Sequence, residues 1–195
     1  MRNYYFIFLY FFLFFLSPSI LAKSGFGIEG GWGFIDIGAA DTAQNIANIS
    51  GSTVSYTSDT GTWVGRFFGD FQISDNFYGE IGYFISGDIT AKYTLSGATA
   101  SESYSANGID FAGVFKSEAG LFVKGGLHSS TVDGQANITI SGTTYAANAA
   151  ASGTGGLFGF GMEGADGERY GYTFYSSVGG LDDADVGFLY YGFKF

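Results

Sequence analysis

Apolar and polar residues alternate with a period of two along most of the chain beyond residue 22. In the stretch TWVGRFFGDFQI, which begins at Thr62, one face carries Trp, Phe and Ile, while Arg66 and Asp70 lie on the other. This alternation predicts β-strands with one apolar and one polar face, and no stretch shows a convincing helical period. Eight segments share the pattern: 26–34, 62–73, 77–86, 108–115, 121–128, 157–164, 169–175 and 185–195.

The connections between these segments are of two kinds. Three are short and polar, at 74–76, 117–119 and 165–168, and predict tight turns. Long segments lie at 38–60, 87–107 and 129–153. Each holds a Ser-Gly between Thr- and Ile-rich flanks, in ISGSTVSY, LSGATASESY and ISGTTY, which predicts hairpin tips that join strand extensions. Short turns at one end and long excursions at the other are typical of an outer-membrane barrel.

Two barrel architectures fit the alternation, with opposite polarity. A soluble ligand-binding barrel of the lipocalin type buries its apolar face, and Gly30-Gly31-Trp32 weakly matches the G-x-W of that family. A membrane barrel turns the apolar face to lipid. The polar face combines glycines with few lysines, which would make a poor solvent surface. It carries Glu29, Arg66, Asp70, Glu80, Asp110, Lys124, Glu163 and Arg169. The sequence therefore predicts an all-β, eight-stranded antiparallel up-and-down transmembrane barrel in contact with outer-membrane lipid.

The N-terminus has the layout of a secretory signal peptide. Arg2 precedes an apolar run, 4–16, which is followed by Pro18 and the small residue Ala22. We expect cleavage after residue 22, which leaves 23–195 as one barrel domain; an uncleaved anchor helix is the alternative. The formal net charge of −10 at pH 7 argues against a nucleic-acid partner, and the absence of cysteine excludes disulfides.

Several stretches together resemble the OmpA-like family of small outer-membrane barrels: FQISDNFYGEIGYF, LFVKGGL, FGMEGADGERYGYTF and the closing LYYGFKF. The resemblance implies a salt-bridge cluster that closes the lumen. Its motif positions fall on Glu80, Glu163 and Arg169, but the fourth-strand lysine position falls on Val114. Lys124 on the next strand faces the same interior, and we expect it to supply the missing cation. Arg66 and Asp70 are expected to form a second pair. No peptidoglycan-binding domain is expected.

The same resemblance gives the last strand a role in biogenesis. Outer-membrane barrels commonly end in alternating aromatics with a terminal Phe, which the barrel-assembly machinery recognises. The matching residues are Leu189, Tyr191, Phe193 and Phe195. The same row also predicts an aromatic girdle at the membrane interface, and the two roles are compatible.

These features predict a monomeric protein of the outer membrane of a Gram-negative bacterium. An eight-stranded barrel is just wide enough for side chains to fill, so we expect a plugged lumen and a structural or surface-interaction role for long loops that face an external partner. The alternatives are a small porin-like channel and, less favoured, a lipid-modifying enzyme built on His128. No cofactor or metal is predicted, because the acidic segment 182–185 has the character of a solvated turn.

Overall fold

The structure is a computed structural model that describes residues 24–35, 38–181 and 184–195. The signal peptide predicted at 1–22 lies outside these residues. The described elements, in chain order, are β1 (Ser24–Ile35), α3 (Ala39–Ser50), β2 (Ser55–Ser58), β3 (Gly61–Ser74), β4 (Phe77–Ser86), β5 (Ile89–Leu95), β6 (Ala98–Lys116), β7 (Leu121–Ile140), β8 (Thr143–Glu163), β9 (Glu168–Tyr175), the short helix η1 (Val178–Gly180) and β10 (Val186–Lys194).

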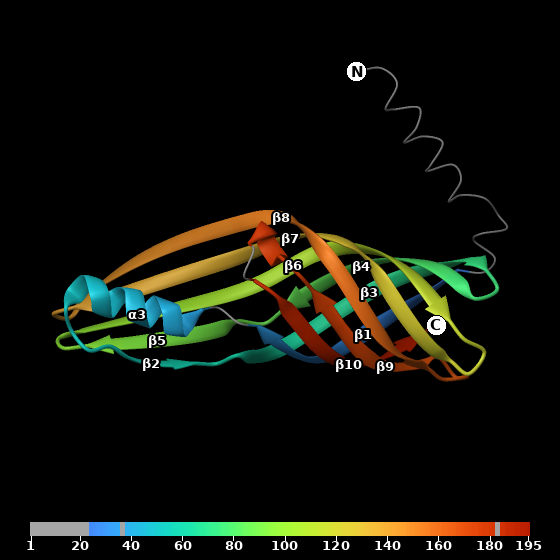
Figure 1. Ribbon diagram of the computed structural model, residues 1–195, viewed down its shortest axis with the longest axis horizontal. Helices are drawn as coiled ribbons and strands as arrows, with labels where there is room; N and C mark the ends of the chain where they lie inside the picture. Colours follow the sequence, from blue (N-terminus) through green and yellow to red (C-terminus); the bar gives the residue numbers. More distant parts are fainter. Residues whose placement is uncertain (1–23, 36–37, 182–183) are drawn as a thin grey trace, which may run out of the picture.

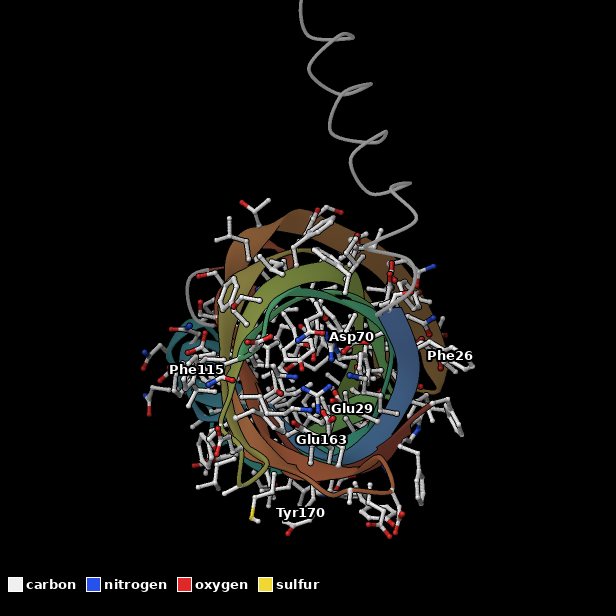
Figure 2. All side chains as sticks on the ribbon, turned by 90° about the vertical axis from the view of Figure 1, so that its right-hand side faces the viewer. Phe26, Glu29, Asp70, Phe115, Glu163 and Tyr170 are labelled. Atoms are coloured by element: carbon white, nitrogen blue, oxygen red, sulfur yellow. The ribbon has the colours of Figure 1, made fainter. Side chains whose placement is uncertain are left out.

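Eight of the strands close into a ring. The antiparallel order is β1–β3–β4–β6–β7–β8–β9–β10, and β10 pairs with β1. Figure 2 looks along this ring from one end. The chain end completes the closure, because the Phe195 N–H donates to the Phe26 carbonyl at 2.7 Å and the two rings stack 5.3 Å apart. The predicted eight-stranded all-β barrel is confirmed.

The wall has its apolar face outside. Phe26, Phe115 and Tyr170 point away from the ring in Figure 2, while Glu29 and Asp70 point into it. Trp32 is 54% exposed, so it is not the buried tryptophan of a lipocalin, and the soluble-barrel alternative is wrong. An apolar outer belt over a closed hydrogen-bonded wall suits lipid, because no backbone edge of the ring is left unpaired.

The three short connections lie together at one end of the barrel, to the right in Figure 1. They link β3 to β4, β6 to β7, and β8 to β9, as the sequence predicts. Gly120 and Gly167 have φ of +83° and +85°, a backbone region that glycine enters without steric cost.

At the other end, β6, β7 and β8 run on past the ring and are joined by β5 and β2 (Figure 1). We call this five-stranded sheet with α3 the extension. Two of its connections are the predicted hairpin tips, at Ser96-Gly97 between β5 and β6 and at Ser141-Gly142 between β7 and β8.

The prediction of a hairpin tip at the first Ser-Gly, Ser50-Gly51, is wrong. Ser50 ends helix α3, and Gly51 is its C-cap with φ of +64°. The helix packs Ala39, Ala43 and Ile46 against the inner face of β5 and β6. These three positions are spaced to lie on one face of a helix. The spacing is visible in the sequence, but the period-two alternation of the surrounding segments obscured it. No helix in the described part of the chain is long and apolar enough to cross a membrane.

Candidate functional site

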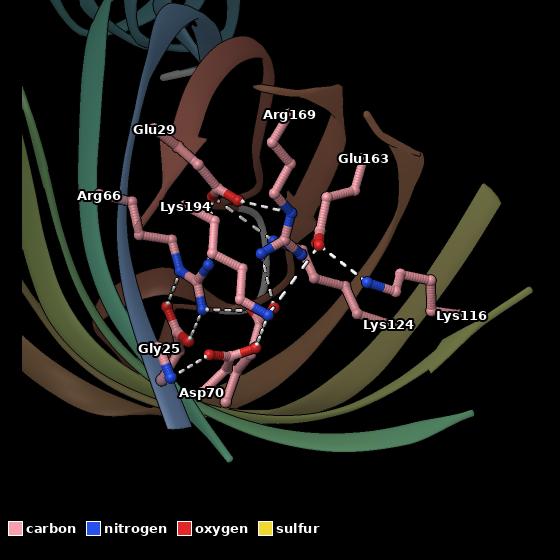
Figure 3. A network of polar contacts seen from close by, with 11 residues as sticks. Gly25, Glu29, Arg66, Asp70, Lys116, Lys124, Glu163, Arg169 and Lys194 are labelled. Atoms are coloured by element: carbon pink, nitrogen blue, oxygen red, sulfur yellow. Dashed lines mark hydrogen bonds and ion pairs between the residues drawn. The ribbon is translucent and has the colours of Figure 1, made fainter. Parts of the chain in front are cut away.

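The barrel interior is filled by buried ion pairs, which form two groups. The first, the central cluster, consists of Glu29, Arg66, Glu80, Asp110, Lys124 and Arg169 from six different strands. The second, the rim cluster, lies toward the tight turns and consists of Asp70, Lys116, Glu163 and Lys194. Figure 3 shows contacts of both groups from close by.

Arg66 on β3 organises the central cluster. It donates from Nε and Nη2 to the two carboxylate oxygens of Asp110, at 2.9 and 2.7 Å, and also contacts Glu29 and Glu80 at 3.1 Å each. Glu29 lies directly across from Arg66 on β1, whereas Asp110 is two strands away. Gly82 on the intervening strand makes that reach possible, since a Cβ atom there would lie 2.6 Å from Arg66 Nε. The bidentate geometry is the strongest form of this pair.

Arg169 and Lys124 complete the cluster from the other side of the barrel. Arg169 Nη1 contacts Glu80 Oε1 at 2.7 Å, and its guanidinium lies between the rings of Phe68 and Phe122, at 4.6 and 4.3 Å from their centroids. Lys124 Nζ lies 3.6 Å from Glu29 Oε2. The central cluster thus holds three cations against three carboxylates, and all six side chains are at most 3% exposed.

The rim cluster is less buried. Lys194 reaches Asp70 and lies 3.9 Å from Glu163, which also accepts from Lys116 Nζ at 2.8 Å. The backbone N–H of Gly25 donates to Asp70 at 2.9 Å. The lysine side chains are 19% and 26% exposed, so this group sits at the mouth of the lumen, where water screens it.

The structure corrects the pairing expected from the sequence. Arg66 does not pair with Asp70, because four residues along a strand separate them by about 13 Å, at roughly 3.3 Å per residue. Glu163 is the Cα partner of Arg169 across β8 and β9, yet its carboxylate belongs to the rim cluster. Lys124 sits directly across from Val114, so its cation stands beside the position where the family pattern expects lysine.

Four members of the clusters were not among the predicted site residues: Glu29, Asp110, Lys116 and Lys194. Glu29 and Asp110 occupy polar-face positions of their alternating strands, and this pattern in the sequence could have identified them as lumen residues. Lys116 and Lys194 stand at strand ends, where alternation is hard to read. Only the register between strands shows which of these charges meet.

An apolar and aromatic layer lies on the extension side of the central cluster. Tyr175 packs against Phe84 and stacks on Phe188, and its hydroxyl donates to Asp110 at 3.0 Å. His128 also belongs here. Its Nε2 lies 2.8 Å from the carbonyl of Ser176, and its Nδ1 lies 3.1 Å from the hydroxyl of Ser130.

These contacts give His128 a structural role. With Nε2 donating to the Ser176 carbonyl, Nδ1 accepts from Ser130, whose oxygen accepts the Gly179 N–H at 2.9 Å. The ring is 2% exposed and faces the lumen, not the lipid that a lipid-modifying enzyme would act on. Among the described residues, no carboxylate contacts it.

The remaining predicted features lie at the chain end. Leu189, Tyr191 and Phe193 point outward and are 56%, 53% and 40% exposed, and Phe195 is 68% exposed. They form an outward row of one leucine and three aromatic side chains, and their role as an assembly signal stays a prediction. In the acidic segment before β10, Asp182 and Asp183 lie outside the described residues, and Asp185 accepts the Ser177 N–H at 3.1 Å.

Several solved structures are similar to this chain. Ail, the attachment invasion locus protein of Yersinia pestis, matches with a TM-score of 0.53 at 12% identity, over 88% of this chain and 97% of Ail. OprG from Pseudomonas aeruginosa matches with a TM-score of 0.50 at 10% identity, over 89% and 96%. The chain has the fold of the small outer-membrane β-barrels. No protein-family model and no curated protein matches the sequence.

The fold indicates where in the cell the two charge clusters lie. The predicted location in the outer membrane agrees with it, and the resemblance to OmpA-like barrels holds at the level of the fold. In that setting the central cluster lies inside the ring of strands, and its six side chains are buried.

Proposed function

We propose that this chain is an integral outer-membrane protein whose lumen is closed by its paired charges and which acts at the cell surface through its extension. Two observations support the closed lumen. The central cluster is balanced in charge, and an aromatic layer packs over it. Nothing in this arrangement calls for catalysis, so we assign no enzymatic role.

The observation that supports a surface role is the free edge of β8 in the extension. From Leu157 onward β8 pairs with β9, and near Gly156 it contacts Ser176. From Thr143 to Ala151, however, the described residues provide a strand partner on one side only, β7, and η1 lies beside the edge at its Ala151 end. This stretch, TTYAANAAA, has no charge, no proline and no register shift.

An unpaired strand edge is a template for strand addition unless charge, proline or a bulge blunts it. None of these devices is present between Thr143 and Ala151. An extended segment of a partner protein can therefore continue the sheet through backbone hydrogen bonds. This edge stands above the barrel, on the side of the long connections, where an external partner would approach.

The charge of the extension selects among partners. One Ail structure holds a heparin analogue, sucrose octasulfate, which is a polyanion. The described external segments of this chain carry a single base, Lys92, against six acids: Asp41, Asp59, Asp88, Glu102, Asp133 and Asp185. Such a surface repels polyanions, so we do not carry heparin binding over, and we expect a neutral or basic partner.

Trimming the extension tests this proposal. Val132 pairs with Ala151, so a variant that replaces 133–150 with Asn-Gly ends the hairpin in a two-residue turn and leaves the ring intact. We expect the trimmed protein to keep its heat-shifted gel band. We also expect bacteria that produce it to lose the adherence to surfaces coated with a basic protein, such as histone, that the full chain confers. Equal adherence of the two strains would refute a role for this hairpin.

A further inference from the structure

A cavity opens at the external mouth of the barrel, between the first turn of α3, β6, β7 and the described residues 178–181 and 184–186. Its volume is about 670 Å³, within the range of small-molecule sites. Apolar side chains form much of its lining, including Ile35, Val132, Val178 and Val186. Three of these are at most 9% exposed, so the cavity has a firm apolar base.

The charged side chains that line this cavity, among the described residues, are all acidic. Asp41 of α3 and Asp185 before β10 both line it, and they approach from different elements. Oδ1 of Asp185 accepts the Ser177 N–H, while Oδ2 has no hydrogen-bond partner among the described residues. No base lines the cavity among the described residues, and Lys92 lies on the exposed face of β5, opposite the face that Ala91 and Tyr93 bury against α3.

Tyr104, which lines one wall of the cavity, is held by the half-buried carboxylate of Glu102. The Tyr104 hydroxyl donates to Glu102 Oε2 at 3.0 Å, and the Tyr93 hydroxyl donates to Glu102 Oε1. Burial, together with the charge of Glu102, raises the pKa of Tyr104 to about 12. The tyrosine is therefore neutral at physiological pH and presents an ordered aromatic surface, and the carboxylates supply the charge.

The cavity does not lead through the barrel. Val178, Val186 and Ile35 also belong to the apolar layer that contains Phe84 and Phe188, and the central cluster lies beneath that layer. A molecule that enters from outside is held at the mouth. This arrangement suits a binding site and does not suit a transport path.

We propose that this mouth cavity binds a small amphipathic cation, with its apolar body on the base formed by Ile35, Val178 and Val186 and its ammonium group between Asp41 and Asp185. An apolar pocket with a few convergent polar groups is the usual form of a small-molecule site, and two carboxylates select a cation. The inference uses the orientation of the barrel but not the free edge of β8, so the two proposals can fail separately.

Binding of three matched probes to the full chain in nanodiscs of phosphatidylcholine, a lipid without net charge, tests the proposal. Naphthylmethylamine is the cation, naphthylmethanol its neutral counterpart and naphthoate the anion, and empty nanodiscs give the background. We expect the amine to bind at least about tenfold more tightly than the other two, because a charged hydrogen bond contributes about that factor. Equal binding of amine and naphthoate, or no binding above the empty discs, overturns the proposal.

Variants locate the site. Asp41→Asn combined with Asp185→Asn is expected to weaken amine binding about tenfold, since both carboxylates are removed. Val132→Trp is expected to abolish it by filling the cavity. The matched control is Asp133→Asn, which removes a carboxylate from the exposed face of β7 outside the cavity and should leave binding within twofold. If Asp133→Asn weakens binding as much as the double variant, the attraction is to the whole acidic surface and the site is refuted.

Discussion

Strand β7 passes through two environments, and its two halves show what each one demands. From Leu121 to Ser130, exposed and buried positions alternate, with Lys124 and His128 on the buried side. From Asp133 to Ile140 nearly every residue is exposed, on both faces. The same backbone ladder continues without a register shift. The alternation therefore reflects what lies on either side of the sheet, lipid and a packed lumen in one half and solvent in the other.

The two halves also differ in how they are held. The barrel wall is closed and its interior is cross-linked by ion pairs from several strands. The extension is an open sheet, and α3 covers only the part formed by β5 and β6. Changes in the barrel should therefore have large effects on overall stability, and changes in the outer part of β7 and β8 should have local ones.

Loss of Arg66 is expected to have the largest effect. Arg66→Ala leaves Glu29, Glu80 and Asp110 buried with too little positive charge, which costs on the order of 3–5 kcal/mol. Urea unfolding in detergent micelles measures the loss. Lys92→Ala, on the exposed face of the extension, is the control and should change the free energy of unfolding by less than about 0.5 kcal/mol. Similar losses of unfolding free energy in the two variants would contradict the expected difference between the barrel and the extension.

A lysine scan of matched isoleucines compares the outer faces of the two regions. Ile81 and Ile138 are 41% and 45% exposed, but Ile81 lies midway along a wall strand and Ile138 lies in the extension. Ile81→Lys should cost about 2–4 kcal/mol, because it places a cation in lipid. Ile138→Lys should cost close to nothing, since the side chain stays in water. Unfolding in lipid bilayers measures both, and equal costs would mean that the lipid belt is misplaced.

The tyrosines of the extension should titrate at high pH. Burial and the hydrogen bond to Glu102 also raise the pKa of Tyr93 above its ordinary value. A raised pKa means that the stabilisation is present below the unfolded value of about 10 and is lost as the pH rises through about 12 for Tyr104. Tyrosinate absorbance should show this late step, and Glu102→Gln should move it to lower pH. An unchanged step in that variant would remove Glu102 as a cause.

The smallest effect is expected at the hairpin tip between β7 and β8. Ser141 has φ of +51° and Gly142 has φ of +85°. Ser141→Asn should stabilise the tip by roughly 0.5 kcal/mol or less, because Asn enters the left-handed region more readily than Ser. Hydrogen exchange at Thr139 and Thr144 should slow slightly, while exchange in the barrel wall stays unchanged. Faster exchange at the tip would contradict the assigned turn.

The sequence predicts the barrel better than the extension for a physical reason. Lipid on one side and a filled lumen on the other impose a strict alternation, and the eight wall strands follow it. In the extension, solvent imposes no such pattern, and helix α3 was missed because its apolar stripe is built from Ala39, Ala43 and Ile46. The alternation along each strand correctly placed Glu80, Lys124 and Arg169 on the inner face. Which of these charges meet depends on the pairing register between neighbouring strands, which the alternation does not give. Arg66 was therefore assigned the wrong partner.

The most direct test of the account is single-channel recording of the full chain in planar lipid bilayers. With the central cluster paired and the aromatic layer above it, the unsubstituted barrel should pass little or no ionic current. Arg169→Ala removes the partner that Glu80 contacts at 2.7 Å and should raise the conductance. Large, stable open channels in the unsubstituted protein would contradict the closed lumen and identify the chain as a porin.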